Sequence, residues 1–260
     1  MIPLVKLDAI DSTNDFLKRW LQERPLEAAL AVSTNHQKQG KGQRGNHWIS
    51  EPSKNLALSV FIPLSGVSAS SQFFLNKCVS VCVIEVLESL KIPELAIKWP
   101  NDILSCQKKI GGILIETSIK KNYLEYAIVG IGLNVNQIVF DKLPKAGSLA
   151  SVTNNEFQVD SICQHILNRI EAKFPIHLLS ESSELHQAYL SHLFKYQKTA
   201  QFIDSEGNEF NATLVGVAPT GQLQLQTQAG LKNFLMKDKN DVLLIDKYSA
   251  KNIIKNHILN

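Results

Sequence analysis

Cysteine and paired metal ligands are scarce in this sequence. The 260 residues include four cysteines, and no two of them have C-x-x-C spacing. The seven histidines lack the i, i+4 spacing that places two metal ligands on one face of a helix. These absences argue against a disulfide framework, a zinc module and a bound transition metal. We expect buried free thiols in a reducing compartment at Cys78, Cys82, Cys106 and Cys163.

Long apolar runs and a strong charge of one sign are also missing. No uninterrupted apolar run approaches the roughly 20 residues that cross a bilayer. The N-terminus has no basic segment followed by an apolar signal core. The net charge of +3 is too small to indicate nucleic-acid binding by itself. Because the chain is 44% hydrophobic, it can form a sizeable core, and we expect a soluble cytoplasmic protein without a membrane segment.

Hydrophobic spacing divides most of the chain into helices and strands, which indicates a protein that contains both. Apolar residues recur at helical spacing behind Ser12, and residues 56–62 alternate as a strand does. The predicted helices are residues 12–21, 70–90, 162–174 and 184–193. The predicted strands are residues 30–34, 56–62, 95–99, 110–117 and 123–135.

After Tyr196 the pattern changes to short segments that alternate apolar with polar residues. These segments read AQFID, EFNATLVGVA, QLQLQTQ, KNFLM and DVLLID, and turn residues separate them. They predict a small all-β module of the barrel-like kind. We therefore expect two domains, residues 1–195 and 196–260.

The segment GKGQRGNHW, residues 40–48, combines glycines with positive charge. Its glycines match G-x-G-x-x-G, but a dinucleotide site needs a helix directly after the third glycine. Here NHWISEPSKN follows and leads into a strand, so the segment joins strand to strand. The Walker loop and the kinase H-R-D and D-F-G segments do not occur in the sequence. Two interpretations remain: an anion-binding loop that uses Lys41 and Arg44, or a solvated basic turn.

Three further segments place polar residues or glycines at strand ends. In KWPND, residues 98–102, Pro100 predicts an abrupt turn that displays Asn101 and Asp102. In KKIGGILIE, the pair Gly111–Gly112 within a strand suggests that a ligand approaches the backbone closely. The segment GIGLNVN, residues 130–136, repeats this pattern. Each alone is also typical of a turn, a bulge or a strand edge, but their combination favours a ligand site.

Taken in order, these segments resemble those of the biotin protein ligases. The family's motifs correspond to Ser12–Thr13–Asn14, to HQKQGKGQRGNHW at 36–48, to KWPND at 98–102, to KIGGILIE at 109–116 and to GIGLNV at 130–135. The resemblance covers about residues 8–150. It implies an α+β fold in which a mixed β-sheet catalytic domain of the biotin/lipoate ligase type is flanked by helices. A small SH3-like C-terminal barrel is also implied.

The resemblance implies a two-step reaction. Biotin and ATP would give biotinyl-5′-AMP and pyrophosphate, with Mg²⁺ on the phosphates. A lysine of a biotin carboxyl carrier protein, belonging to acetyl-CoA carboxylase or a related carboxylase, would then take up the biotin. Ser12 lies close to Met1, so we expect the short form without a DNA-binding domain and without nucleic acid as a partner. The family includes monomers and homodimers.

The resemblance also assigns residues to roles. Catalytic roles fall to Lys109, Asp102 and Lys41, with Asp102 as a transient Mg²⁺ contact. Biotin binding falls to Ser12, Thr13, Asn14, Gln37, Gly40, Lys41, Gly42, Gln43, Lys109, Gly112 and Gly130. Nucleotide binding falls to Lys41, Arg44, Trp48, Asn101, Lys109 and Asn134. Simpler roles compete at some positions: helix capping for Ser12 and Thr13, turn stabilisation for Asp102, and core packing for Trp48.

The glycine segment departs from the family's usual arginine-rich loop. Lys41, Gln43 and Asn46 stand where many members have arginine, whereas Arg44 remains. Lysine lacks the bidentate fork of arginine and glutamine lacks charge. We therefore expect Lys41 and backbone amides to carry more of the phosphate contact.

Two other functions compete with biotin ligation. A lipoate ligase or octanoyltransferase shares the architecture, and an octanoyltransferase would need a cysteine nucleophile such as Cys106. A non-catalytic biotin sensor could dispense with Lys109 and with the KWPND turn, and this chain has both.

Overall fold

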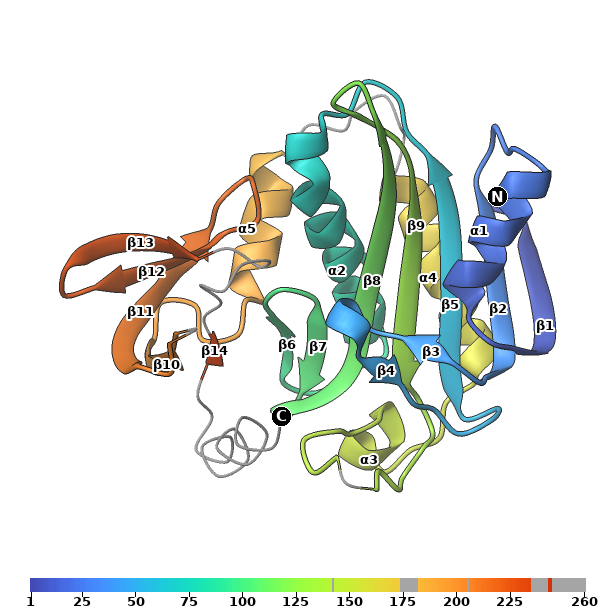
Figure 1. The fold of residues 1–260 in the computed structure, drawn as a ribbon. Coiled ribbons are helices and arrows are strands. Elements are labelled where there is room, and N and C mark those ends of the chain that lie inside the picture. Colours follow the sequence, from blue (N-terminus) through green and yellow to red (C-terminus); the bar gives the residue numbers. More distant parts are fainter. Residues whose placement is uncertain (142, 174–181, 205, 235–242, 245–260) are drawn as a thin grey trace. The chain divides into compact units, whose positions relative to one another are not determined.

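The computed structural model describes residues 1–141, 143–173, 182–204, 206–234 and 243–244 (Figure 1). Within it the chain divides into two compact units, the first comprising Met1–His192 and the second beginning at Leu193. Each unit has its own sheet.

A seven-stranded sheet forms the centre of the first unit. Its order is β1-β2-β5-β9-β8-β7-β6, in which β1 and β2 are parallel and all other neighbours antiparallel. This confirms the mixed sheet flanked by helices. The strands are β1 (Leu4–Ile10), β2 (Leu30–Gln37), β5 (Asn55–Pro63), β6 (Leu95–Lys98), β7 (Asp102–Ser105), β8 (Lys108–Lys120) and β9 (Tyr123–Asn134).

The glycine segment adds a small hairpin between β2 and β5. It consists of β3 (Gly40–Lys41), the 3₁₀ turn η1 (Gln43–Gly45) and β4 (His47–Trp48), and β3 pairs with β4. The expected strand-to-strand connection is therefore confirmed, and it has structure of its own.

Helices cover both faces of the sheet, with α1 in front of it and α2 and α4 behind it in Figure 1. On the α1 face, Leu17 packs in a core cluster with Val32, Phe61 and Ile128. The helices are α1 (Thr13–Glu23), α2 (Gln72–Ser89), α3 (Leu149–Thr153), α4 (Val159–Lys173) and α5 (Ser183–Ser191), and the 3₁₀ turn η2 (Ala69–Ser71) precedes α2.

Helix α2 is a core helix. It buries residues on all sides, because it packs against β6 and β8 as well as α4 and α5. The stretch Ala69–Ser89 has the length and apolar composition of a membrane span, but 78% of its most apolar window is buried inside the fold. Packing within the protein therefore accounts for its composition.

The second unit contains a five-stranded antiparallel sheet of order β13-β12-β11-β10-β14. Its buried side chains include Phe202, Leu214 and Leu225. The prediction of short strands after Tyr196 is confirmed. Within the described part of this unit, no pairing joins the outer strands β13 and β14, so barrel closure stays a prediction. The strands are β10 (Thr199–Ile203), β11 (Glu209–Val217), β12 (Leu223–Thr227), β13 (Gly230–Phe234) and β14 (Leu243–Leu244).

Candidate active site

A row of small residues crosses the sheet on the face that α1 partly covers. Ala57 of β5 pairs with Gly132 of β9, Gly132 pairs with Gly112 of β8, and Gly112 pairs with Asp102 at the start of β7. Paired residues in neighbouring strands project to the same side of a sheet. This face of the sheet therefore has a row of small residues that ends at a carboxylate.

The indole of Trp48 lies over this row of small residues. A Cβ added to Gly132 would lie 2.6 Å from Trp48 Cε2, and one added to Gly112 would lie 3.3 Å from Trp48 Cζ3. Only glycine at position 132 permits this approach. Trp48 is partly exposed, but its Nε1 is buried without a hydrogen-bond partner among the described residues. Trp48 is therefore not an ordinary core tryptophan.

Lys109 and Asp102 form an ion pair at the end of the row. Lys109 Nζ lies 2.5 Å from Asp102 Oδ1 and 5.8 Å from the centre of the Trp48 ring. Backbone hydrogen bonds from Lys109 N to Lys145 O and from Gly147 N to Lys109 O hold the lysine at the start of β8. The Lys109 side chain remains 40% exposed, and its ammonium group is held beside a carboxylate, an indole and glycine backbone.

Two predicted asparagines lie at the ends of neighbouring segments. Asn101 Nδ2 donates to Ile113 O at 2.7 Å, so this amide fixes the KWPND turn against β8. Asn134, at the end of β9, donates from Nδ2 to Gly147 O at 2.9 Å. Its Oδ1 is buried and has no hydrogen-bond partner in the described part of the chain. Since buried acceptors are seldom unpaired, Asn134 Oδ1 is available to a donor from a ligand.

The N-terminus of α1 forms a second polar cluster on the same face. Ser12 caps the helix, and its Oγ accepts from Asp15 N at 3.4 Å. Thr13 N and Thr13 Oγ1 both contact Gln37 Oε1, at 3.0 and 3.1 Å. Ser12 and Thr13 are almost fully buried. Ser12 therefore caps α1. Hydrogen bonds hold Thr13 next to Gln37 at the end of β2.

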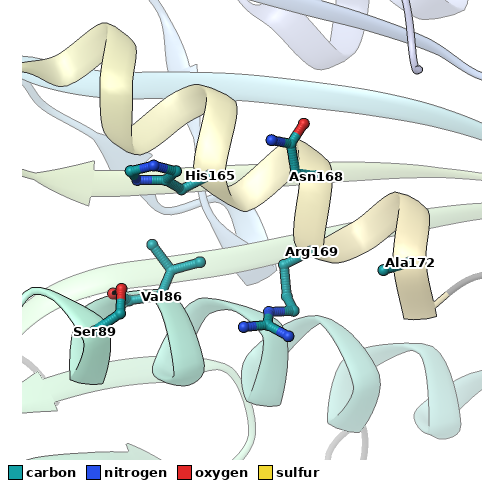
Figure 2. Close-up of a pocket in the computed structure, with 6 residues that line it drawn as sticks. All are labelled: Val86, Ser89, His165, Asn168, Arg169 and Ala172. Atoms are coloured by element: carbon teal, nitrogen blue, oxygen red, sulfur yellow. Dashed lines mark hydrogen bonds between the residues drawn. The ribbon is translucent and has the colours of Figure 1, made fainter.

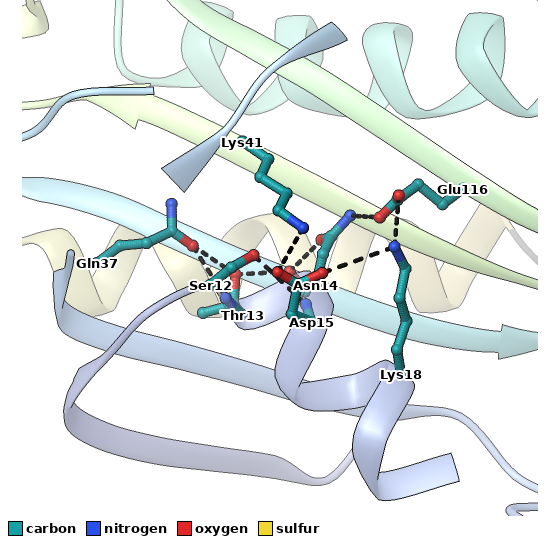
Figure 3. Close-up of polar contacts among 9 residues, drawn as sticks. Ser12, Thr13, Asn14, Asp15, Lys18, Gln37, Lys41 and Glu116 are labelled. Atoms are coloured by element: carbon teal, nitrogen blue, oxygen red, sulfur yellow. Dashed lines mark hydrogen bonds and ion pairs between the residues drawn. The ribbon is translucent and has the colours of Figure 1, made fainter. Parts of the chain in front are cut away.

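Asn14 links this cluster to the sheet, as Figure 3 shows. Its Nδ2 donates to Glu116 Oε2 of β8 at 2.8 Å, and Ser59 Oγ of β5 donates to Asn14 Oδ1 at 2.5 Å. Lys18 Nζ occupies the other oxygen of Glu116 at 2.6 Å. A Cβ at Gly130 would lie 2.6 Å from Asn14 Oδ1, so Gly130 must be glycine for Asn14 to take this position.

Lys41 points toward α1, where its Nζ lies 2.7 Å from Asp15 Oδ2 (Figure 3). The hydrogen bond to Asp15 raises the pKa of the Lys41 ammonium above its usual value. The structure thus brings Lys41 to the α1 cluster, where Asp15 is its ion-pair partner.

The rest of the glycine segment is shaped by backbone contacts. A Cβ at Gly40 would lie 2.4 Å from Trp48 O and 2.6 Å from Gln37 Nε2. Gly42 N donates to Asn46 O at 2.7 Å and closes the hairpin around Gln43. Gly45, with φ of +77°, needs glycine for its backbone conformation. The side chain of Arg44 lies outside the described structure, so its predicted role stays a prediction.

Comparison with known proteins relates part of this chain to a protein family. Residues 7–134 match the model of the Biotin/lipoate A/B protein ligase family. This part of the chain is therefore similar to the domain of that family. The matched residues include both polar clusters and the whole small-residue row.

This chain has relatives among curated proteins. It is 33% identical over 129 residues to the bifunctional ligase/repressor BirA of Escherichia coli, covering 50% of this chain and 39% of that protein. It is 27% identical over 241 residues to BirA of Bacillus spizizenii, covering 90% of this chain and 73% of that protein. The chain thus matches well under half of the Escherichia coli relative.

A solved structure shares the fold over most of the chain. A biotin protein ligase from Aquifex aeolicus, in complex with biotin and ATP, matches with a TM-score of 0.76 and 23% identity. The match covers 94% of this chain and 100% of that one. At this identity the match supports the biotin/lipoate ligase fold.

The first unit also has a pocket that contains none of the predicted site residues. This pocket, of about 310 Å³, lies between α2 and α4 (Figure 2). It is lined by Val86, Ser89, His165, Asn168, Arg169 and Ala172. Because α2 and α4 lie behind the sheet, the pocket is separated from the small-residue row.

The cysteines are free, as expected. Three are buried, whereas Cys106 in the β7–β8 turn is only partly buried, so the prediction of burial is wrong there. Burial raises the pKa of the Cys163 thiol to about 11. A hydrogen bond with Cys78, together with burial, raises the pKa of Cys82. Neither Cys82 nor Cys163 is suited to act as a thiolate nucleophile.

Sequence reasoning assigned no role to four residues that organise the α1 cluster. Asp15 holds Lys41, Ser59 and Glu116 hold Asn14, and Lys18 holds Glu116. One signal was present in the sequence, because Ser59 interrupts the apolar run LALSVFI and is fully buried. A buried serine in such a strand requires a polar partner.

Proposed function

We propose that this chain is an ATP-dependent biotin protein ligase. It activates biotin as biotinyl-5′-AMP and transfers it to a lysine of a biotin carboxyl carrier protein. One observation carries the proposal: on one face of the sheet, the Lys109–Asp102 pair ends a row of small residues that leads toward the α1 cluster. Relatives named biotin--[acetyl-CoA-carboxylase] ligase, from Mycobacterium tuberculosis and Paracoccus denitrificans, support the same activity.

Lys109 brings together the two reacting anions in this proposal. The biotin carboxylate must approach an α-phosphate that is also negative, and a shared cation offsets their repulsion. The Lys109 ammonium has the exposure to contact both, and each charge-assisted hydrogen bond contributes about 1.5–3 kcal/mol. When the two anions bind, they would replace Asp102 as the ion-pair partners of Lys109.

The α1 cluster binds the ureido head of biotin. Ser12, Thr13, Asn14 and Gln37 supply its polar contacts, and Gly130 and Gly112 leave room for the ring and chain along the sheet. The backbone of Gly40, Lys41, Gly42 and Gln43 covers the ligand from the hairpin side. The contact of the hairpin with Gln37 supports this placement, because a Cβ added to Gly40 would lie 2.6 Å from Gln37 Nε2.

The nucleotide lies beside Trp48 and Asn134. Trp48 provides an aromatic surface, and Trp48 Nε1 and Asn134 Oδ1 are a buried donor and a buried acceptor that need partners. Asn101 shapes the adjoining turn. Lys41 and Arg44 supply positive charge to the phosphates, and Lys41 must leave Asp15 to do so.

Asp102 serves two purposes in the proposal. Mg²⁺ usually keeps several waters and binds few protein carboxylates, so a single carboxylate is a suitable contact. This fits the described residues, in which no group of three or more His, Cys, Asp or Glu side chains comes together. Mg²⁺, when bound, neutralises phosphate charge. Asp102 also positions the incoming lysine or accepts its proton in the second step.

The glycine hairpin closes over biotin and the adenylate and keeps water from the mixed anhydride. Residues 1–195 form the catalytic domain, and residues 196–260 form an SH3-like barrel. The protein acts in the cytoplasm as a monomer or homodimer.

Substrate-dependent pyrophosphate release tests the proposal. The protein is incubated with Mg-ATP and with biotin, lipoate or octanoate in separate reactions. We expect release with biotin alone. Release with lipoate and none with biotin would assign the chain to the lipoate branch of the family.

A further inference from the structure

A continuous chain of hydrogen bonds connects Glu116 to Gln37. Glu116 Oε2 contacts Asn14 Nδ2 at 2.8 Å, Asn14 Oδ1 contacts Ser59 Oγ at 2.5 Å, and Ser59 Oγ contacts Thr13 Oγ1 at 2.7 Å. Thr13 N then contacts Gln37 Oε1 at 3.0 Å. The residues along this path belong to α1 and to strands of the central sheet, and Asn14, Thr13 and Ser59 are almost fully buried.

We propose that Glu116, held by Lys18, is a positioning residue that sets the direction of the side-chain hydrogen bonds from Asn14 through Ser59 to Thr13. The consequence is a fixed donor and acceptor pattern at the ureido end of the biotin site. The inference rests on the proposed function, since it concerns how that site recognises its ligand.

The direction begins at Glu116, because an ionised carboxylate can only accept hydrogen bonds. Asn14 must therefore present its Nδ2 to Glu116 and its Oδ1 to Ser59. Ser59 has one hydroxyl proton, and Asn14 Oδ1 takes it at 2.5 Å. The 2.7 Å contact between Ser59 and Thr13 then requires the proton of the Thr13 hydroxyl. Two hydroxyl protons cannot serve all three oxygen–oxygen contacts, so the longest one, 3.1 Å from Thr13 Oγ1 to Gln37 Oε1, has no proton, and Gln37 Oε1 accepts from Thr13 N.

The far end of the chain follows from these assignments. Thr13 Oγ1 has given its proton to Ser59 and keeps lone pairs for a ligand N–H. Gln37 Oε1 accepts from Thr13 N, so Gln37 Nε2 is directed elsewhere as a donor. An acceptor next to a donor complements a group with an N–H beside a C=O, which is the arrangement in a cyclic urea.

Lys18 makes the direction depend on the charge of Glu116. Lys18 Nζ lies 2.6 Å from Glu116 Oε1, so the two carboxylate oxygens serve Lys18 and Asn14 separately (Figure 3). In Glu116→Gln, the single amide oxygen would face the ammonium and the amide N–H₂ would face Asn14. Asn14 would then turn its Oδ1 toward position 116. Ser59 Oγ would face the Nδ2 donor of Asn14 instead of the Oδ1 acceptor.

A double-mutant cycle tests the inference. The variants are Glu116→Gln, Asn14→Asp and the exchange Asn14→Asp/Glu116→Gln. In the exchange variant, the new amide at position 116 donates to the new carboxylate at position 14. The bond between positions 14 and 116 is reversed, but that carboxylate still accepts from Ser59, so the direction from Ser59 onward and the net charge are both kept. Glu125→Gln is the matched control, because Glu125 of β9 pairs with Ser118 and Lys120 and lies outside the chain of hydrogen bonds.

The readouts are the biotin dissociation constant by calorimetry, the KM for ATP and the melting temperature. We expect each single variant to bind biotin about 10- to 100-fold more weakly, with little change in the KM for ATP. The exchange variant should recover most of the affinity, and Glu125→Gln should match wild type.

Failure of the inference can be told apart from failure of the proposed function. If wild type binds biotin and Glu116→Gln binds it equally well, the inference is wrong while the proposed function stands. Weak binding by all three variants, without recovery in the exchange variant, also overturns it, because loss of folding or packing would then be the common cause. If wild type binds no biotin, the proposed function itself fails.

Discussion

At the scale of single residues, the missing Cβ atoms of glycine shape the site as much as its charged groups do. Gly130 and Gly132 lie two residues apart on β9 and face the same side, where Asn14 and Trp48 occupy the space that larger side chains would fill. The sequence marked these glycines as points of close approach. It could not say that the approaching groups belong to the protein itself.

Gly130→Ala tests this crowding. Its Cβ would lie 2.6 Å from Asn14 Oδ1, so Asn14 must move and its hydrogen bond with Ser59 must break. We expect biotin affinity to fall by about 5- to 150-fold, since a lost buried hydrogen bond costs about 1–3 kcal/mol. Calorimetry with biotin measures the effect. Gly216→Ala in β11, which meets only the flexible end of Gln224, is the control and should leave biotin affinity unchanged.

Lys109→Ala tests the role of the ammonium. Without it, no side chain at this position neutralises both the carboxylate and the α-phosphate, so we expect adenylate formation to stop while biotin still binds. Pyrophosphate exchange and equilibrium biotin binding measure the two properties separately. Lys120→Ala, at the exposed end of β8, is the control. A wild-type exchange rate in Lys109→Ala would remove this residue from the reaction.

At the scale of elements, segments with strong hydrophobic periodicity were predicted correctly, whereas strands with weak periodicity were missed. The helix behind Ser12 and the buried strand at 56–62 are confirmed as α1 and β5. The strands β1 and β7 were not predicted. Leu4–Ile10 contains charged residues and pairs only with β2 at the sheet edge, while Asp102–Ser105 has four residues. Pairing partners distant in sequence decide such strands, and a local pattern does not show them.

One buried amide, the side chain of Gln137, joins two segments that lie next to the small-residue row. Gln137 Oε1 accepts from Glu51 N at 3.0 Å and from Asn55 Nδ2 at 2.6 Å, and Gln137 Nε2 donates to Val139 O at 2.8 Å. Gln137 therefore connects the segment after Trp48 to the segment after β9. Its contacts with Glu51 and Asn55 join residues more than 80 positions apart, and local patterns in the sequence do not indicate such contacts.

Gln137→Ala should loosen both segments together. It leaves the buried Asn55 amide and the Glu51 N–H without their acceptor, so we expect a loss of about 1–3 kcal/mol in the free energy of unfolding. Chemical denaturation measures this loss. Gln137→Glu keeps the acceptor and should lose less. Equal stability of Gln137→Ala and wild type would contradict the connection.

At the scale of the whole molecule, the first unit brings the candidate site together. The motifs from Ser12 to Asn134 are spread over more than a hundred residues, and the sheet order β5-β9-β8-β7 places them on one face. The identities of Lys109 and Asp102 could be predicted from their motifs. Their 2.5 Å contact, and the pairing of Lys41 with Asp15, depend on tertiary structure that no spacing encodes.

Removal of Mg²⁺ separates the two parts of the proposed site. Chelation with EDTA should stop pyrophosphate release, because the phosphates lose a counter-charge that Lys41, Arg44 and Lys109 alone do not replace. Biotin binding at the α1 cluster, which uses no metal, should be unchanged. Loss of biotin binding in EDTA would contradict this division.

Transfer of biotin to a carrier protein is the most direct test of the central claim. Wild-type protein is incubated with biotin, Mg-ATP and a biotin carboxyl carrier domain, and the carrier is examined by mass spectrometry. We predict the addition of one biotinyl group to one carrier lysine, and no addition when either biotin or ATP is omitted. An unmodified carrier in the complete reaction, or a carrier that receives lipoate in place of biotin, would contradict the account.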